Sequence, residues 1–288
     1  MKGLSIFTRP AGKAGTGIRF RGSLSLTLAL ITTACAFPQI ESFQPPAVWN
    51  QAYQENWDAD SVAEILAGAE DSYVLLDPFD SDEARNAIPA IKARGNTVAV
   101  YISVGTGEDW RDDFEELNGS LVEKYWGEWP GEYFIDRISD EVLSVMKARI
   151  DKAADWGADI IEFDNMDWAF DDSARNKYGF HVTVEESLDY VNRLKDYASS
   201  LGLLCMAKNM TEGVESFAGV TYESALGNRE WWDPEDLKTF LAEDKICVVF
   251  HYKERNPEKA LEYYREQYGE DLLVLIETRS VRGYLHSP

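Results

Sequence analysis

From residue 47 onward, short apolar runs alternate with longer amphipathic stretches along the whole chain. Apolar runs of this length are typical of buried parallel strands, and the amphipathic stretches suit helices that cross back over the sheet. Eight such strands alternating with helices close into a (β/α)8 TIM barrel of about 250 residues. We therefore predict an α/β fold with a single barrel domain over residues 47–288.

The predicted strands are all short and largely apolar: Ala47–Gln51, Tyr73–Pro78, Thr97–Val104, Asp159–Asp164, Leu203–Lys208, Val220–Glu223, Ile246–Tyr252 and Leu272–Glu277. The predicted helices are amphipathic: Ser61–Ala67, Ser81–Arg94, Asp140–Trp156, Val184–Leu201, Pro234–Ala242 and Pro257–Tyr268. Asp140, Thr183 and Asp233 are the expected N-caps of three of them. The longest insertion, Gly105–Ile138, follows the third strand, on the face where such barrels build their active sites.

The first 36 residues contain basic but no acidic side chains. An apolar run, Leu24–Ala36, follows the basic part and ends in Ala34-Cys35-Ala36. This order predicts a secretory signal peptide over 1–36, then a linker over 37–46, and a secreted or periplasmic protein. The run is shorter than the ~20 apolar residues that span a bilayer, so we expect no transmembrane segment.

Three alternatives exist for this N-terminal segment. It could be a disordered basic tail, or the true start codon could lie further downstream. Cys35 could also be a lipid-modified N-terminal cysteine. Simple cleavage is favoured over lipidation because the preceding Thr32–Ala34 lacks the usual aliphatic residue.

The chain is strongly acidic, with 51 Asp and Glu against 28 Lys and Arg. Loss of residues 1–36 would remove five basic residues, leaving 23 and a net charge of −28. Such a surface repels nucleic acid and anionic lipid and would attract a cationic partner. A solvated acidic surface suited to a salty medium explains the charge equally well.

Two cysteines, Cys205 and Cys247, fall in apolar runs beyond the signal segment. They are predicted on the fifth and seventh strands, and strands lie about 4.8 Å apart. A disulfide needs Cα atoms within about 7 Å, so we expect two buried free thiols.

Polar and charged side chains occupy most of the predicted strand ends: Asp77, Tyr101, Ser103, Glu162, Asp164, Lys208, Asn209, Glu223, His251, Tyr252 and Glu277. In barrels of this kind, catalytic groups gather at the C-terminal ends of strands. Because side chains alternate along a strand, Glu162 and Asp164 should share the inward face, with Asp164 nearer the mouth. Ile161 and Phe163 should face the helices.

Glu223 closes the sixth predicted strand and is the natural second carboxylate. Glycoside hydrolysis uses one carboxylic acid to protonate the leaving oxygen and a second carboxylate to attack or stabilise the sugar cation. The plainer alternatives are a helix cap and a solvated acid at Glu162 and Asp164, and a salt bridge from Glu223 to Lys208.

Tryptophans near the loops after strands three, four and six add a sugar-binding signal: Trp110, Trp126, Trp129, Trp168, Trp231 and Trp232. Ordinary loop packing would explain about half of such rings. The chain has no HExxH, cysteine cluster, glycine-rich phosphate loop or GxSxG elbow, so we predict no metal and no cofactor. Asp77-x-x-Asp80 and Asp164-x-x-Asp167 could bind a hard cation, but spacing of this kind is common by chance.

The motifs together resemble glycoside hydrolase family 114, the endo-α-1,4-polygalactosaminidases. The matching stretches run in family order: Val74–Asp77, Tyr101–Gly105, Glu108–Arg111, Trp129–Glu132, Asp136, Arg149, Glu162–Asn165, Asp167, Gly179-Phe180, Lys208-Asn209 and Glu223. The resemblance implies export, a barrel, and hydrolysis of α-1,4-linked galactosamine polymers such as those of biofilm matrix, with retention of configuration. A partly deacetylated polymer of this kind is cationic, which suits the acidic chain.

Carried over by position, Asp164 matches the family's proposed nucleophile and Glu223 its general acid/base. The substrate-binding set combines matched pocket positions with strand-end and loop residues: Asp77, Tyr101, Trp110, Arg111, Glu162, Asp167, Lys208 and Asn209. Two departures bear on the exact substrate. Ile161 stands where relatives commonly have a small residue, and the His251-Tyr252 segment lacks an acidic residue often found there.

Two other functions are weighed against this one. A non-catalytic carbohydrate-binding or matrix protein could use the same cleft and would leave chain length unchanged. A Schiff-base lyase could use Lys208, but the surrounding carboxylates argue against the lowered lysine pKa that it needs. A retaining hydrolase predicts carboxyl groups about 5–5.5 Å apart. The sequence assigns no oligomeric state.

Overall fold

The computed structural model describes residues 47–53, 59–127, 129–225, 234–252, 254 and 256–276. All of them belong to one unit of the chain, Pro38–Pro288. Several sequence predictions lie outside the described residues: the signal peptide over 1–36 with Cys35, the linker over 37–46, Trp231, Trp232, the cap at Asp233, and Glu277.

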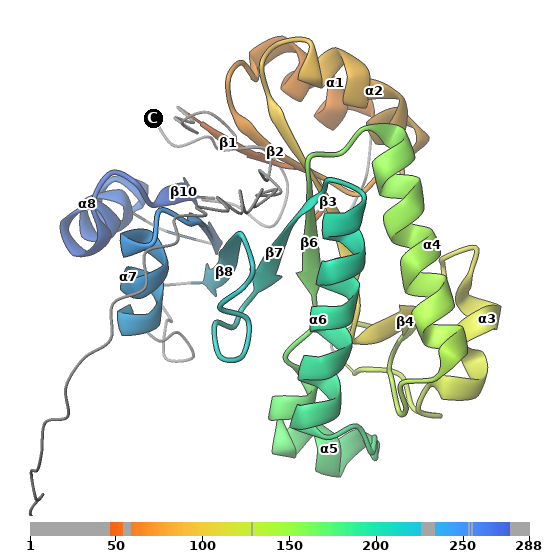
Figure 1. Ribbon diagram of the computed structural model, residues 1–288. Helices are drawn as coiled ribbons and strands as arrows, with labels where there is room; N and C mark the ends of the chain where they lie inside the picture. Colours follow the sequence, from red (N-terminus) through yellow and green to blue (C-terminus); the bar gives the residue numbers. More distant parts are fainter. Residues whose placement is uncertain are drawn as a thin grey trace, which may run out of the picture. The chain divides into compact units, whose positions relative to one another are not determined.

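The described residues contain a sheet of eight parallel strands. In sheet order these are β1 (Val48–Asn50), β2 (Tyr73–Leu76), β3 (Thr97–Ser103), β6 (Ile160–Asp164), β7 (Leu204–Lys208), β8 (Gly219–Ala225), β9 (Ile246–Tyr252) and β10 (Leu273–Ile276). β1 and β10 lie close together, so the sheet curls into a nearly closed barrel (Figure 1). The predicted (β/α)8 fold is confirmed.

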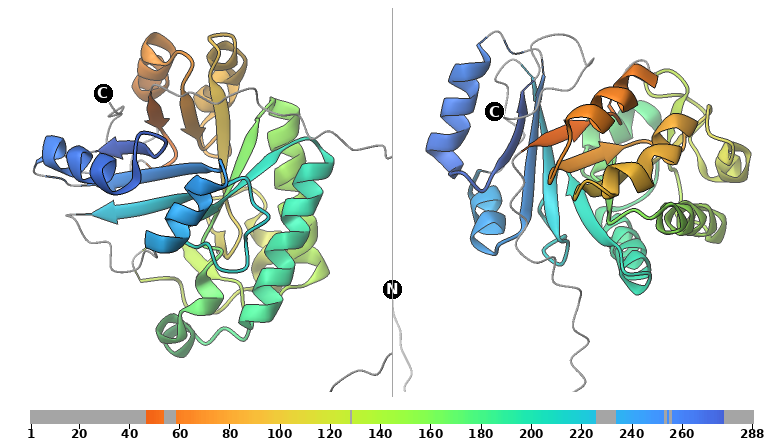
Figure 2. Two further views of the ribbon diagram at one scale, coloured as in Figure 1. Left: turned by 60° about the vertical axis from the view of Figure 1, so that its left-hand side comes forward. Right: turned by 90° about the horizontal axis from the view of Figure 1, so that it is seen from above.

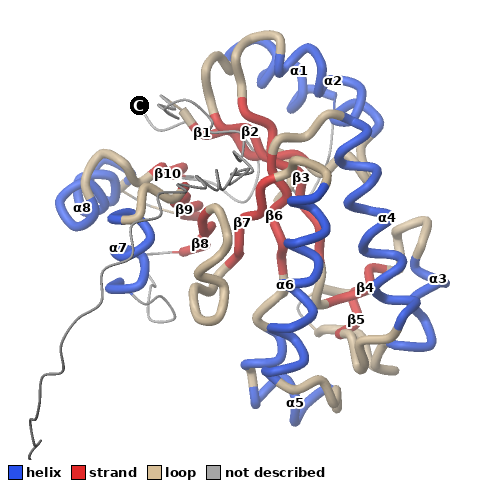
Figure 3. The backbone as a smooth tube through the Cα atoms, viewed as in Figure 1, coloured by secondary structure: helices blue, strands red, loops and turns tan. Residues whose placement is uncertain are grey.

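Helices cover the outside of the strands (Figure 2, Figure 3). They are α1 (Ala59–Gly68), α2 (Asp82–Lys92), α4 (Asp140–Trp156), α6 (Val184–Ser200), α7 (Pro234–Ala242) and α8 (Pro257–Tyr268). These are the six predicted helices. Among the described residues, no helix is both long enough and apolar enough to cross a membrane.

Short polar side chains set where these helices begin. Thr183 caps α6 as predicted, in a reciprocal capping box with Glu186. The predicted cap at Asp140 is wrong. Ser139 is the N-cap of α4, because its hydroxyl accepts the N–H of Val142, and Asp140 is the first helical residue. Asp140 instead places a carboxylate at the positive end of the helix dipole.

The apolar core has two layers, one inside the barrel and one between strands and helices. Side-chain alternation on β6 shows the division: Ile161 and Phe163 pack in the outer layer, whereas Ile160 packs with the interior residues. Glu162 and Asp164 face inward, as predicted. Cys205 and Cys247 are buried and free, which also agrees with the prediction.

The insertion after β3 forms an antiparallel hairpin, β4 (Thr106–Glu108) with β5 (Glu132–Phe134). Between them lie α3 (Phe114–Leu117) and the 3-10 turn Asn118–Ser120. A second excursion after β6 contains the 3-10 turn Trp168–Phe170 and α5 (Asp172–Tyr178). The hairpin, α3 and α5 were not predicted from the sequence.

Candidate active site

Three neighbouring strands bring two carboxylates and a lysine together at the barrel mouth. Lys208 ends β7, and its Nζ lies 3.0 Å from Asp164 Oδ2 on β6 and 3.0 Å from Glu223 Oε2 on β8. Because each oxygen lies 3.0 Å from the same nitrogen, the two oxygens are at most twice that distance apart. The two carboxylates singled out from the sequence therefore share one site.

Each carboxylate also accepts a hydrogen bond from a tyrosine. The hydroxyl of Tyr101 on β3 donates to Asp164 Oδ2 over 2.9 Å, and that of Tyr252 on β9 donates to Glu223 Oε1 over 3.1 Å. Burial and the charge of Asp164 raise the pKa of Tyr101 well above its usual range, so it remains a donor at neutral pH. The two hydrogen bonds hold the carboxylates in defined orientations.

Asn209 orients Glu223 from the end of β7. Its backbone has a φ of 62°, which asparagine tolerates better than most residues. In this conformation the side chain lies along Glu223: Oδ1 accepts the Glu223 N–H over 3.0 Å, and Nδ2 donates to Glu223 Oε2 over 3.3 Å. Asn209, which was predicted to bind substrate, thus contacts one member of the carboxylate pair.

Lys208 is buried and rests on an aromatic ring. Its Nζ lies 3.9 Å from the ring centroid of Tyr53, whose hydroxyl donates to Glu162. Burial alone lowers the pKa of Lys208, but Asp164, Glu223 and Glu162 outweigh this and raise it. Schiff-base chemistry needs a lysine with a depressed pKa, so this environment opposes the lyase hypothesis.

Glu162 lies beneath the site and is fully buried. Burial raises its pKa to about 7, although Lys208 and the Tyr53 hydrogen bond lower it. Glu162 accepts the hydrogen bond of the Tyr53 hydroxyl, and its charge helps to raise the pKa of Lys208. The predicted role of Glu162 in direct substrate binding receives no support from this burial.

Asp77 and Arg111 belong to a buried ion-pair network on the β2 side of the mouth. Arg111 binds Asp77 through two nitrogens, at 3.0 and 2.8 Å, and also lies 2.8 Å from both Asp80 and Glu108. Burial raises the pKa of Asp80 to about 7, against the lowering effect of Arg111. This network fixes the segment after β4 to the end of β2. Trp110, next to Arg111, is 44% exposed.

A second buried network ties the hairpin to the end of β6. The side chain of Asn165 donates to Ser103 Oγ over 3.0 Å and to Glu132 Oε1 over 2.9 Å. Thr106 also donates to Glu132 and bonds with Ser103. Burial, with help from the charge of Glu108, raises the pKa of Glu132 to about 8. Glu132 is therefore largely protonated at neutral pH.

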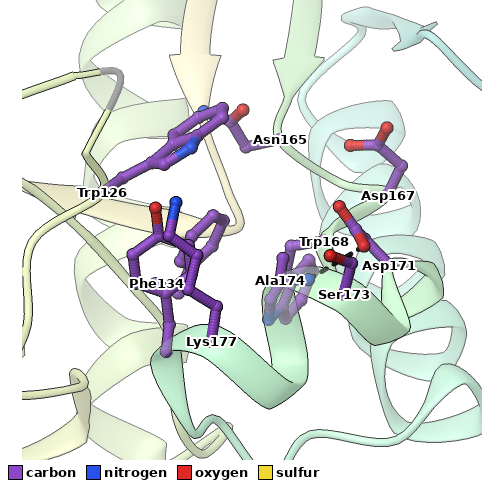
Figure 4. A pocket seen from close by; sticks show the side chains of 10 residues that line it. Trp126, Phe134, Asn165, Asp167, Trp168, Asp171, Ser173, Ala174 and Lys177 are labelled. Atoms are coloured by element: carbon purple, nitrogen blue, oxygen red, sulfur yellow. Dashed lines mark hydrogen bonds between the residues drawn. The ribbon is translucent and has the colours of Figure 1, made fainter.

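A cavity of about 330 Å³ opens beside this network (Figure 4). Its lining comes from the hairpin, the end of β6 and α5: Trp126, Phe134, Asn165, Asp167, Trp168, Asp171, Ser173, Ala174, Lys177 and Tyr178. Asp167 is half-buried on its wall, and burial followed by the charge of Asp164 raises the Asp167 pKa to about 7.

The remaining strand-end and loop residues are either buried in packing contacts or lie at the surface or on the cavity wall. His251 is buried, and both of its ring nitrogens have partners: Nδ1 lies 2.8 Å from the hydroxyl of Tyr264 on α8, and Nε2 lies 2.8 Å from Glu254. Trp168 is buried and donates to the Ile135 carbonyl, which is loop packing. Trp110 and Trp129 are exposed and Trp126 lines the cavity. No three His, Cys, Asp or Glu side chains among the described residues are grouped to hold a metal ion.

Three residues of this region were absent from the predicted site: Tyr53, Tyr252 and Glu132. Tyr252 stands at a predicted strand end, and Glu132 lies in one of the family-like stretches, so a signal existed for both. Tyr53 follows β1 by three residues, beyond the predicted strand, and pattern alone does not identify it.

The comparisons with known proteins agree with this architecture. The model of glycoside-hydrolase family GH114 matches residues 38–287. The structure of Aspergillus fumigatus Ega3, solved in complex with galactosamine, is 20% identical and has a TM-score of 0.62, with 83% of this chain and 92% of that chain covered.

A second similar structure is the glycoside hydrolase domain of PelA from Pseudomonas aeruginosa. It is 15% identical with a TM-score of 0.60, and the match covers 85% of this chain and 98% of that one. At these identities the two structures establish the shared fold. A comparison with curated protein sequences found no match.

Proposed function

This chain belongs to glycoside-hydrolase family GH114 and is a glycoside hydrolase, and from that premise we propose that it cleaves α-1,4-linked galactosamine-containing polysaccharide with retention of configuration. The observation that carries the proposal is the contact of Asp164 and Glu223 with one lysine nitrogen, each over 3.0 Å. Asp164 is assigned as the nucleophile and Glu223 as the general acid/base.

The spacing of the pair supports retention. Retaining enzymes place their carboxyl groups about 5–5.5 Å apart, and inverting enzymes need about 6.5–9.5 Å to admit a water molecule. Asp164 Oδ2 and Glu223 Oε2 are no further apart than twice their 3.0 Å distance to Lys208, a limit that lies above the retaining separation and below the inverting range.

The two carboxylates then act in two steps. Protonated Glu223 gives its proton to the glycosidic oxygen while Asp164 attacks the anomeric carbon, which breaks the glycosidic bond and forms a glycosyl ester. In the second step Glu223 takes a proton from water, and the resulting nucleophile releases the sugar from Asp164. Glu223 is the more exposed partner, with 29% of its side chain accessible against 13% for Asp164, which suits a group that exchanges protons with water.

Two neighbouring side chains, Lys208 and Tyr101, suit these roles. The Lys208 ammonium contacts both carboxylates, so it balances whichever of them is ionised at a given step. Tyr101 fixes the attacking oxygen of Asp164 through its 2.9 Å hydrogen bond.

The substrate assignment rests on charge and on a relative. The chain carries 51 acidic and 28 basic side chains, which favours a cationic polymer over an anionic one. Ega3, a protein with the same fold, was solved with galactosamine. A deacetylated galactosamine polymer combines both properties.

The test is a reducing-end assay on de-N-acetylated α-1,4-galactosamine polymer. Asp164→Asn and Glu223→Gln should each lower the rate by at least about 100-fold. Asp155→Asn and Glu266→Gln are matched controls, since both residues are exposed on outer helices, and they should retain the wild-type rate. Proton NMR of the first product should show the α anomer.

The assay separates the alternatives. Full activity in either site variant removes that residue from its role, and a first product in the β configuration rejects retention. Polymer binding without new reducing ends in the wild-type protein would reject hydrolysis of this substrate and fit the carbohydrate-binding alternative.

We also propose that residues 1–36 are a cleaved export signal, as their basic and apolar pattern indicates. N-terminal sequencing of protein recovered outside the cytoplasm should begin near Phe37. A mature protein that begins at a lipid-modified Cys35 would favour the anchored alternative.

A further inference from the structure

Glu162 is a buried carboxylate that the two-carboxylate mechanism does not use. It stands on β6 two residues before Asp164, deeper in the barrel, and its exposed fraction is 0%. Burial of a carboxylate is costly, so the groups around it indicate what it serves. A side chain at this depth does not reach a sugar at the mouth, and any influence of Glu162 on catalysis must pass through other residues.

A hydrogen bond connects Glu162 to the aromatic ring on which Lys208 packs. The hydroxyl of Tyr53 donates to Glu162 Oε1. The Tyr53 ring also packs edge-on against Tyr101 and Phe250, at centroid distances of 6.0 and 5.2 Å. Lys208 Nζ lies 3.9 Å from the centroid of the same ring. Glu162 therefore helps to fix the ring that positions the lysine ammonium.

Carboxylates act on the charge of Lys208 from two sides. Asp164 and Glu223 contact Nζ from the mouth, each over 3.0 Å, and Glu162 acts on it from within the barrel. The ammonium of a lysine is carried by a flexible four-carbon stem, so charges on one side alone would draw it toward that side. The charge of Glu162 opposes this displacement.

The groups around Glu162 and Tyr53 come from strands on every side of the barrel. They are Tyr53 after β1, Tyr73 on β2, Tyr101 on β3, Asp164 on β6, Lys208 on β7, Thr221 and Glu223 on β8, Tyr252 on β9 and Leu275 on β10. Burial, followed by nearby carboxylates, raises the pKa of Tyr53, Tyr73 and Tyr101 well above their usual range, so these three stay protonated. Glu162, whose pKa burial raises to about 7, changes its charge near neutral pH.

We propose that Glu162 is a positioning residue that acts through Tyr53 and Lys208 and keeps the lysine ammonium between Asp164 and Glu223 during the reaction. This inference rests on the proposed function of that carboxylate pair, and it replaces the substrate-binding role predicted for Glu162. When Glu162 is ionised, its charge offsets part of the Lys208 charge and opposes early loss of the proton that Glu223 donates. Glu162 therefore extends activity toward higher pH.

The kinetic test uses Glu162→Gln, which keeps the size of the side chain and an acceptor for the Tyr53 hydroxyl but removes the charge. At about pH 5.5, where Glu162 is mostly protonated, kcat on de-N-acetylated α-1,4-galactosamine polymer should stay within about twofold of wild type. At about pH 8.5, kcat should fall at least about tenfold while KM changes less than about twofold. A purely structural role would lower stability without this pH-dependent loss of kcat.

Tyr53→Phe separates the hydrogen bond from the ring. It keeps the ring against Lys208 and removes the donor to Glu162, so kcat should fall at least about fivefold at both pH values. Combined with Glu162→Gln at about pH 8.5, it should lose little more than the more impaired single variant, because the two residues act in one chain.

A tyrosine–carboxylate pair on the outer helices provides the matched controls. Tyr197 on α6 donates its hydroxyl to Asp151 on α4 over 2.7 Å. Tyr197→Phe and Asp151→Asn remove the same chemical groups as the site variants, and both should keep the wild-type kcat at each pH.

A second measurement needs no substrate. Nitrogen-15 NMR of the Lys208 ammonium, assigned by its absence in Lys208→Arg, should show a shift that titrates near pH 7. The measurement is made in an Asp167→Asn background, because Asp167 also has a pKa of about 7 and interacts with Lys208. Glu162→Gln should abolish most of this titration.

The outcomes distinguish this inference from the proposed function. A wild-type protein that leaves the polymer uncut rejects the substrate assignment, and the NMR titration then decides the role of Glu162 by itself. Wild-type kcat in Glu162→Gln at about pH 8.5, additive losses in the double variant, or a Lys208 signal that titrates unchanged in Glu162→Gln would each reject the positioning role.

Discussion

The side-chain amide of Asn165 donates a 2.9 Å hydrogen bond to Glu132 Oε1, joining the residue after the proposed nucleophile to a hairpin that begins on a different strand. Asn165 has a φ of 55°, so its backbone needs support in the left-handed region. With a pKa near 8, Glu132 is mainly protonated at neutral pH. It therefore acts as a neutral hydrogen-bonding group.

Glu132→Gln should consequently behave like the wild-type enzyme. The amide oxygen can still accept from Asn165 and Thr106, and no charge is lost near pH 7. Glu132→Ala leaves buried donors unsatisfied and should lower the free energy of unfolding by about 1–3 kcal/mol and kcat by more than it changes KM. Urea unfolding and steady-state kinetics of both variants measure this. A Gln variant as impaired as the Ala variant would show that Glu132 acts as an anion.

The stability of the protein should fall between about pH 5 and pH 8. Burial raises the pKa of Asp80, Glu162 and Asp167 to about 7 and that of Glu132 to about 8, from ordinary values near 4. Over this window the folded state binds more protons than the unfolded state, so the free energy of unfolding decreases as pH rises. Thermal melting across this range should show a declining Tm.

Glu132→Gln provides the internal check for this pH effect. It should match the wild type at pH 5 and be more stable at pH 9 by more than about 1 kcal/mol, because the variant removes the cost of ionising a buried acid. A Tm that rises from pH 5 to pH 8 in the wild type would contradict the assigned pKa shifts.

Replacing Lys208 should be costly in activity. Lys208→Met leaves Asp164 and Glu223 without their shared cation, and kcat/KM should fall at least about 100-fold. Lys208→Arg keeps the charge but not the compact geometry, so partial activity is expected. Lys195→Met, on α6, is a control that should retain full activity. Wild-type rates in Lys208→Met would exclude an electrostatic role for this residue.

Gly105 should not tolerate a side chain. A Cβ at this position would overlap the backbone carbonyl oxygen of Asn165, so Gly105→Ala must shift the hairpin away from β6. We expect a loss of at least about 2 kcal/mol in stability, together with reduced kcat. At Gly119, a Cβ would meet nothing within 4 Å, which makes Gly119→Ala the matched control. Equal stability of the two variants would show that the close approach of Gly105 to Asn165 is unimportant.

Part of the site was accessible from the sequence because strand periodicity is a local property. Apolar positions of period two on β6 required Ile161 and Phe163 to face the helices, which left Glu162 and Asp164 inside. The same reasoning could not separate their roles. The structure buries Glu162 completely beneath Lys208 and leaves Asp164 at the mouth.

The residues predicted to bind substrate were harder to assign, since their partners come from distant parts of the chain. Asp77 and Arg111 were expected in a substrate pocket, and the structure shows them joined in a buried ion-pair network with Asp80 and Glu108. The N-cap of α4 shows that neighbouring residues can also be ambiguous from sequence. Ser139 and Asp140 are both good capping residues, and the hydrogen bond to Val142 decides between them.

The alternation of apolar and amphipathic segments along the chain was enough to predict the barrel, its strand order and the strand ends at which charged groups stand. Three relationships appear only in the folded molecule: Lys208 bridges Asp164 and Glu223, Tyr53 lies against Lys208, and Trp126 and Asp167 line one cavity. Those relationships depend on how the closed sheet and the hairpin place side chains that are far apart in the sequence, and local patterns carry no information about such distances.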